Sequence, residues 1–466
     1  MLNITLPDKR SVKERKYVFD IIFGELLGLD YSIRVEESGE DYSLSLDNGN
    51  SIIFKDHFFS KFGKDLEYLN IENIPENVLF ISNSYNPEED IPVIYGDEEF
   101  QDVPDKNSGA RKIICGIDVI ASTFFMLTRW EEYVVKERDE RHRFISEYSL
   151  AFRFGFLDRP VVNEYIEMIW NMLLKLGYSQ PRRELSYQLI PTHDVDVPLF
   201  SMMGGFWYKI RYILIRELRK EKNLLNALYT LIYIFKATLA DKGFWRDPYD
   251  TFEYLMDLSE NYGAKSRFYF MSGGSASIDI PIYDVDRGFV EGLFEKIKER
   301  GHVIGFHPSS RTFDKPSMWK EEYKTLSNVS PLPVKSGRQH LLAFEVPHTW
   351  QIWEDNGLEE DMTMGYVDKS GFRCGICHSF SVYNILSQEK LHLKEKPLIA
   401  MEVSFVNYMK YSPERMEQAI FEYIDIIKKY KGDFVILWHN NNINKSQWRN
   451  YSYIYEKLML SSREEK

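Results

Sequence analysis

Two aspartates in the segment THDVD are spaced so that they could bind a metal ion and transfer a proton. Asp194 and Asp196 end the apolar run YQLIP, and positions i and i+2 of a strand point to the same face. Neighbouring carboxylates repel each other, and a shared proton or a bound cation relieves that repulsion. One aspartate could bind a metal while the other accepts a proton from water. The alternative is an acidic turn whose carboxylates cap a following helix.

Two histidines end other apolar segments. His307 follows HVIGF and precedes a proline, and His439 follows VILW near the end of the chain. A lone histidine is more often structural than catalytic. In combination with the Asp-x-Asp segment, however, these imidazoles favour a metal site. Histidine nitrogen and carboxylate oxygen are both among the ligands that zinc takes in proteins.

The elements that must position these residues alternate between strand and helix from residue 186 onward. This alternation predicts a parallel sheet or a βα-barrel, in which active sites gather at the carboxyl ends of the strands. THDVD, HPSS and WHN all stand at such ends. A length of 466 residues predicts two domains. We expect a smaller mixed α+β accessory domain over residues 1–185, a polar linker at SQPRRELSY, and an α/β domain over residues 186–466.

The motifs of residues 186–445 resemble those of the polysaccharide deacetylases, the NodB-homology group of carbohydrate esterases. The resemblance implies a distorted (β/α) barrel. It also implies that Asp194 in THDVD is the general base and that Asp196 is a metal ligand. GHVIGFHPSSR is similar to the second motif of the family and makes His307 a ligand, whereas ILWH makes His439 the general acid.

One position departs from the pattern of the family. Arg311 stands where the second histidine of a His-x-x-x-His pair is expected. A zinc site usually needs three protein ligands, so we expect His340 in SGRQHLLAF to supply the third. His193 would face the opposite side of the strand from the aspartates, and a two-ligand site that binds metal weakly is the remaining alternative. By the same resemblance Arg338 is expected to hold Asp194. Separately, we interpret the phrase GFRCGICHSF as placing Arg373 in the cleft.

The resemblance implies a divalent metal, most simply zinc, and hydrolysis of N- or O-acetyl groups on a glycan or a glycan intermediate. The alternative is a glycan-binding protein of the same fold that lost catalysis when it lost the second histidine of the metal site.

CGICH also matches the pattern of covalent haem attachment, but we expect Cys374 and Cys377 to be small core residues.

A helical insertion at about residues 199–245 carries many apolar and aromatic residues. Residues 206–245 contain eight Lys or Arg and three Asp or Glu, a local charge of +5. Such a pair of helices suits an anionic membrane surface or a lipid-linked sugar. The alternative is a hairpin packed on the barrel or at a dimer interface.

The whole chain is acidic, with a formal net charge of −13, which argues against a nucleic-acid partner. Three cysteines are too few for a disulfide framework and fit a reducing compartment. No apolar stretch follows the basic residues at the N-terminus, and no run approaches the roughly 20 apolar residues of a membrane span. We therefore expect a cytoplasmic protein, with peripheral contact to the inner membrane through residues 206–245.

Overall fold

The computed structural model describes the chain in two compact units. Unit 1 comprises Met1–Ser186, Glu345–Glu354 and Gly371–Pro397, and unit 2 comprises Tyr187–Phe344, Asp355–Ser370 and Leu398–Lys466. The structure describes all residues of the chain except 38, 105–108, 204, 214, 216–217, 219–223, 241–244, 275–282, 287 and 462–466. The predicted division at residue 185 assigned 345–354 and 371–397 to the second domain, whereas these two segments pack with unit 1.

Unit 1 contains a mixed sheet with the strand order β2-β1-β3-β4-β8-β7. Its strands are β1 (Leu2–Leu6), β2 (Tyr31–Val35), β3 (Tyr42–Ser45), β4 (Ser51–Phe54), β7 (Gly96–Pro104) and β8 (Arg111–Ile117). The segments NVLFISNS and IPVIYG, whose apolar residues predict strands, form a small antiparallel pair, β5 (Leu79–Ile81) with β6 (Ile91–Val93). The later segments add helix α11 (His348–Asp355), apart from its last residue, and the hairpin β14 (Phe380–Asn384) and β15 (Glu389–Glu395).

The helices of unit 1 follow the apolar patterns of the sequence. They are α1 (Val12–Phe19), α2 (Val119–Thr128), α3 (Trp130–Val134), α4 (Leu150–Arg153) and α5 (Val161–Lys175). The apolar segment IDVIASTFFMLTRWEEYVV predicts one helix, but it is divided into α2 and α3 because Arg129 takes a left-handed conformation with φ of 52°. Gly177 lies just beyond the end of α5, and its φ of 83° is typical of a glycine that ends a helix.

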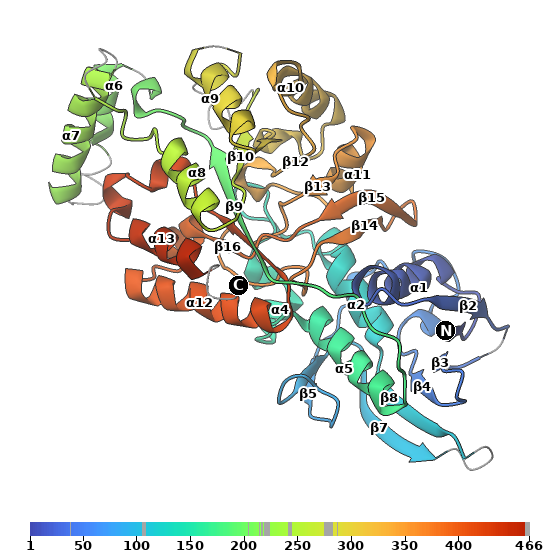
Figure 1. Cartoon of the computed structure of the whole chain (residues 1–466). Helices are drawn as coiled ribbons and strands as arrows, with labels where there is room; N and C mark the ends of the chain where they lie inside the picture. The colour runs from blue at the N-terminus through green and yellow to red at the C-terminus, as the bar shows by residue number, and fades with distance from the viewer. Residues whose placement is uncertain are drawn as a thin grey trace. The chain divides into compact units, whose positions relative to one another are not determined.

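Unit 2 is built on a parallel sheet with the strand order β13-β12-β11-β10-β9-β17-β16 (Figure 1). Every neighbouring pair in this order is parallel. The strands are β9 (Gln188–Val195), β10 (Arg267–Phe270), β11 (Val303–Phe306), β12 (Ser336–Gly337), β13 (Glu360–Asp361), β16 (Ala400–Met401) and β17 (Asp433–Leu437). All residues of β9 except the first are buried, as expected for a strand covered on both faces.

Helices alternate with these strands and cover the sheet. They are α8 (Phe252–Asn261), α9 (Gly288–Glu299), α10 (Pro316–Val329), α12 (Pro413–Lys429) and α13 (Ser452–Ser461). Helix α12 begins where its sequence indicates, because the Ser412 side chain caps its start and Pro413 occupies the first turn. Its buried residues recur on one face, at Met416, Ala419, Ile420, Tyr423, Ile424 and Ile427.

The predicted α/β class with a parallel sheet is confirmed, but the sheet of unit 2 is open. Strand β16 ends the strand order and pairs only with β17 among the described residues. The segment KPLIAMEVSF predicts a longer strand, yet only Ala400 and Met401 pair, because the chain turns into a helical segment at Ser404–Tyr408. A two-residue strand offers few backbone groups for a further neighbour, so the sheet does not close into a barrel here.

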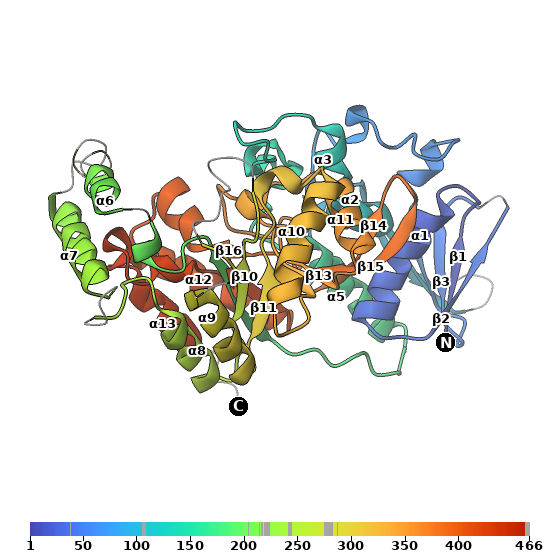
Figure 2. The same cartoon turned by 90° about the horizontal axis from the view of Figure 1, so that it is seen from above.

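Two further helices, α6 (Phe206–Ile213) and α7 (Leu224–Ala240), form the predicted insertion between β9 and α8. They lie side by side at the edge of unit 2 in both views (Figures 1 and 2). Within the described part of the chain, no helix combines the length and the apolar character needed to cross a bilayer.

Candidate metal centre and active site

The candidate residues of unit 2 come together at the carboxyl ends of its parallel strands. This is the edge of an α/β sheet at which ligands generally bind. Asp194 and Asp196 lie at the end of β9, His307 directly follows β11, and the other members follow the ends of β12, β16 and β17. These others are Arg338, His340, Glu402 and His439.

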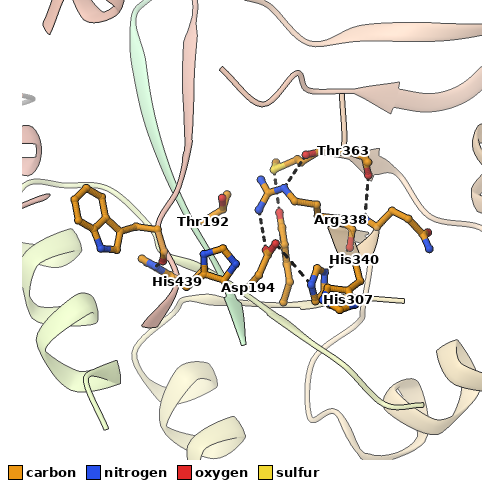
Figure 3. Close-up of polar contacts among 12 residues, drawn as sticks. Thr192, Asp194, His307, Arg338, His340, Thr363 and His439 are labelled. Carbon is orange, nitrogen blue, oxygen red and sulfur yellow. Dashed lines mark hydrogen bonds and ion pairs between the residues drawn. The ribbon is translucent and has the colours of Figure 1, made fainter. Parts of the chain in front are cut away.

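Asp196, His307 and His340 form a possible metal site. Each offers one ligand atom, and these atoms all lie within 4.8 Å of one another. Oδ1 of Asp196 is 3.4 Å from Nε2 of His307 and 3.9 Å from Nε2 of His340. The two imidazole rings lie with their centroids 5.1 Å apart (Figure 3). The structure thus brings His340 close enough to Asp196 and His307 for the three side chains to share one ion.

The donor atoms of this cluster fit a cation. Oδ1 of Asp196 and Nε2 of His307 are shielded from solvent and have no hydrogen-bond partner. Nδ1 of His307 donates to the backbone carbonyl of Arg338 at 2.6 Å, which fixes the tautomer and leaves a lone pair on Nε2. Because shielded polar atoms without partners are costly, a bound cation would satisfy both. Two imidazoles and one carboxylate make up a donor set that zinc commonly takes.

The protonation of the cluster reflects its crowded charges. Burial by itself would raise the pKa of Asp196, but the imidazoles of His307, His340 and His439 outweigh burial and hold that pKa well below its usual value. Burial would lower the pKa of His307, but the carboxylates of Asp194 and Asp196 raise it above its ordinary value. The two carboxylates therefore favour positive charge beside them, which a bound cation would supply.

Asp194 is held from the side opposite the histidines. Nη1 of Arg338 donates to Oδ1 of Asp194 at 2.8 Å, and Nε of Arg338 donates to the carbonyl of Met362 at 2.9 Å. The other carboxylate oxygen, Oδ2, faces His307 Nε2 at 3.7 Å (Figure 3). Asp194 therefore presents one oxygen to the cluster while the guanidinium fixes the other.

His439 approaches Asp196 from the last strand of the unit. Its Nε2 lies 3.8 Å from Oδ2 of Asp196, and its Nδ1 contacts Oε1 of Glu402 at 2.6 Å. The same Glu402 oxygen accepts from the backbone N–H of His439 at 2.9 Å and from Nδ2 of Asn442 at 2.7 Å. Burial would lower the pKa of His439, but the Glu402 carboxylate outweighs it and raises that pKa to about 9. His439 is therefore a protonated imidazole at neutral pH.

Glu402 and the segment after β13 are functional neighbours that the sequence did not indicate. Glu402 is fully buried, and its only sequence signal is its position at the end of an apolar strand. Met362 fixes Arg338 through its carbonyl, and Thr363 Oγ1 accepts from the N–H of Gln339. Neither contact could be inferred from spacing, because both depend on how β12 and β13 pair.

His193 and Arg311 of unit 2 are not members of this cluster. His193 is buried and contacts the carbonyl of Trp438 at 2.7 Å and Oγ of Ser266 at 3.1 Å, as expected for the opposite strand face. Arg311 is exposed in a short turn.

Arg373 belongs to unit 1, where it pairs with a buried glutamate, and its place in the cleft stays a prediction. Its Nε and Nη2 donate to the carboxylate of Glu132 at 2.9 and 2.5 Å, and both side chains are 2% exposed. A guanidinium bound in this way compensates a buried carboxylate. In the same segment, Cys374 and Cys377 are free and buried, as expected for core residues.

A family model and several solved structures are similar to parts of the chain. A family described as being of unknown function, DUF7033, matches residues 2–178. No curated protein matches the chain. Among crystal structures, a candidate polysaccharide deacetylase from Mycobacterium smegmatis is 12% identical, with 62% of this chain and 87% of that chain covered and a TM-score of 0.39.

Two other structures are similar at lower scores. A mutant of BA3943, described as a CE4 family pseudoenzyme with restored enzymatic activity, is 10% identical, with 46% and 59% of the two chains covered and a TM-score of 0.28. The GH57 branching enzyme TK1436 from Thermococcus kodakaraensis is 9% identical, with 60% and 68% covered and a TM-score of 0.27. At these scores the likenesses carry no argument about activity, and the functional inference rests on the geometry of the site.

Proposed function

We propose that this protein is a metal-dependent deacetylase that hydrolyses N- or O-acetyl groups on a polysaccharide or a glycan intermediate. The observation that carries the proposal is the arrangement around Asp196. Three potential ligands converge there, and an arginine-held aspartate and a glutamate-held histidine lie on either side. Binding of a glycan alone would need neither a general base nor a general acid.

Asp196, His307 and His340 would hold the cation, and zinc suits their donor atoms best. When bound, such a cation supplies Lewis-acid chemistry, lowering the pKa of water and stabilising negative charge on an acyl oxygen.

The side chains of the chain account for the proton transfers. Asp194 accepts a proton from the attacking water as the water oxygen bonds to the acetyl carbon. Arg338 holds Asp194 in this orientation, because its guanidinium is bound at two points. As the C–N or C–O bond breaks, His439 donates a proton to the departing amine or alkoxide, and the products are acetate and the free sugar group. Glu402 favours the protonated form of His439 that this step requires.

Acetate release from a panel of N- and O-acetylated sugars tests the proposal. The protein is stripped with a chelator, reloaded with zinc, and assayed in both states beside the Asp194→Asn variant. We expect release only from the reloaded parent protein. Asp257→Asn is the matched control, because the Asp257 carboxylate is 61% exposed on α8 and pairs only with the surface residue Arg300 among the contacts described here. If the reloaded protein binds acetylated glycans but releases no acetate from any of them, the chain is a glycan-binding protein.

A further inference from the structure

Helix α7 carries its small residues inward and its large apolar residues outward. Ala227, Thr230, Ile234 and Ala237 are its buried residues, and they recur on one face of the helix. This face packs on Phe200 and Tyr249 to form a small separate core. The hairpin is therefore anchored to unit 2 through one side of α7.

The outward face of the hairpin is apolar as well. Leu224, Leu228 and Phe235 of α7 are 77%, 54% and 66% exposed. On α6, Trp207 is 79% exposed, and its neighbours Phe206 and Tyr208 are 52% and 59% exposed. A helix in water normally carries polar residues on its outer face, and contiguous apolar surface of this kind marks a binding surface.

An open groove between the two helices continues this surface. Its volume is about 590 Å³, and its walls include Ile210 of α6 and Leu225, Leu228 and Leu231 of α7. The exposed apolar surface therefore includes a groove. Because the walls of the groove are apolar, hydrocarbon would fill it more favourably than water.

Basic and aromatic residues accompany the apolar face. Residues 206–245 carry eight Lys or Arg and three Asp or Glu, whereas the whole chain has a net charge of −13. Arg211 is exposed on α6, and the ammonium of Lys236 lies 5.6 Å from the ring centroid of the exposed Trp245. Tryptophan and tyrosine prefer the headgroup level of a bilayer, and clustered basic residues are attracted to anionic lipid.

The hairpin is fastened to the segments that follow two candidate catalytic strands. Helix α7 contacts Phe200–Met202, which lies just beyond Asp196, and Ser446–Trp448, which lies just beyond His439. The hydroxyl of Tyr233 donates to the carbonyl of Asn444, and the guanidinium of Arg449 is 4.4 Å from the ring centroid of Tyr229. The exposed face is therefore built on the carboxyl-end side of unit 2.

We propose that helices α6 and α7 bind the surface of a bilayer that contains anionic phospholipid. The apolar side chains would enter the boundary between headgroups and acyl chains, and the basic residues would contact lipid phosphates. Charge favours this occupant over a second copy of the chain, because two copies of a segment with a local charge of +5 repel each other. The bound helices would lie in the plane of the interface, with their apolar face toward the acyl chains. This binding does not depend on the deacetylase activity.

Vesicle flotation of the full chain tests the proposal. The vesicles are phosphatidylcholine alone or phosphatidylcholine with about 30% phosphatidylglycerol, at about 0.05 M and 0.5 M salt. We expect the partition coefficient to be at least about tenfold higher on the anionic vesicles at low salt, and to fall toward the neutral-vesicle value at high salt.

A matched pair of triple variants separates the hairpin from general surface effects. Leu224→Ser/Leu228→Ser/Phe235→Ser should lower the partition coefficient by at least about tenfold. The control Phe152→Ser/Leu174→Ser/Leu460→Ser changes the same residue types at helix positions that are 40%, 50% and 44% exposed, and it should bind like the parent. Circular dichroism checks that both variants fold.

Three outcomes would overturn the proposal. One is that the parent does not float with anionic vesicles, and another is that the two triple variants bind equally well. Alternatively, light scattering could show a dimer that only the hairpin variant dissociates, which would identify a second copy of the chain as the occupant.

Discussion

Arg338 binds Asp194 and the Met362 carbonyl with two different nitrogens, at 2.8 and 2.9 Å. Two bonds from one planar guanidinium fix the direction in which the Asp194 carboxylate points. The second oxygen of Asp194 is thereby turned toward His307 and the possible metal site. Asp194 and Asp196 thus lie at the same strand end but have different partners, since Asp194 binds Arg338 whereas Asp196 faces the histidines.

The two aspartates should fail in different ways when changed to asparagine. Asp194→Asn should lower turnover by about 10³-fold, because it removes the proposed base, while zinc stoichiometry stays unchanged. Asp196→Asn should lose both turnover and zinc, because it removes the proposed ligand. Acetate release and elemental analysis of dialysed protein measure the two properties. Equal zinc loss in both variants would contradict this division of roles.

His340 should be required for tight metal binding. Its ring faces His307, and its Nε2 lies 3.9 Å from Oδ1 of Asp196. We expect His340→Ala to weaken zinc affinity by more than about 100-fold, since even residues that only orient ligands contribute 10- to 100-fold. Competition with a chelating dye measures the affinity. His392→Ala is the control, because the His392 side chain is fully exposed in unit 1. Unchanged affinity in His340→Ala would show that His340 is not a ligand.

Removing the charge of Glu402 should move the alkaline limb of the pH–rate profile to lower pH. The carboxylate raises the pKa of His439 to about 9, so the proposed acid is protonated below that pH and is lost as the pH rises through it. Glu402→Gln keeps an oxygen acceptor for His439 but removes the charge, which lowers the pKa of the imidazole. We expect a shift of at least about one pH unit in the kcat profile.

The matched control for this shift is Glu422→Gln, because the Glu422 carboxylate is about half exposed on α12, away from the strand ends. Its profile should coincide with that of the parent. An alkaline limb that stays in place in Glu402→Gln would assign the limb to another group.

Unit 1 should lose stability in acid through Glu132. Burial raises the pKa of this carboxyl, but Arg373 and Arg129 outweigh burial and hold it at about 2, against the usual 4.5. A lowered pKa contributes stability that is fully present above pH 4.5 and is lost as the pH falls toward 2. The difference of roughly 2.5 units corresponds to about 3 kcal/mol.

Chemical unfolding of the parent and of Glu132→Gln across this range checks the expectation. The variant should be less stable by about 3 kcal/mol at pH 7, because Arg373 would lose its carboxylate partner and Arg129 would keep only Glu131. The deficit should shrink as the pH approaches 2. Glu137→Gln, which changes an exposed glutamate of the same segment, should match the parent throughout.

The sequence by itself determined the strand ends that carry Asp194, Asp196, His307 and His439. Apolar runs mark buried strands, and a polar residue directly after such a run must lie at the carboxyl edge of a parallel sheet. The same patterns predicted the α/β class and the two-helix insertion. The resemblance of the motifs, rather than periodicity, pointed to Arg338 and His340.

The tertiary structure alone decided which of these side chains meet. Strands β12 and β16 have two residues each, too few for a periodic signal, yet they carry Arg338 and Glu402 to the site. Arg373 binds Glu132, which lies 241 positions away in the chain, and a local motif holds no information about a contact at that separation. The open edge at β16 was also outside the reach of the sequence, because closure of a sheet depends on pairing between strands and not on the pattern within any one of them.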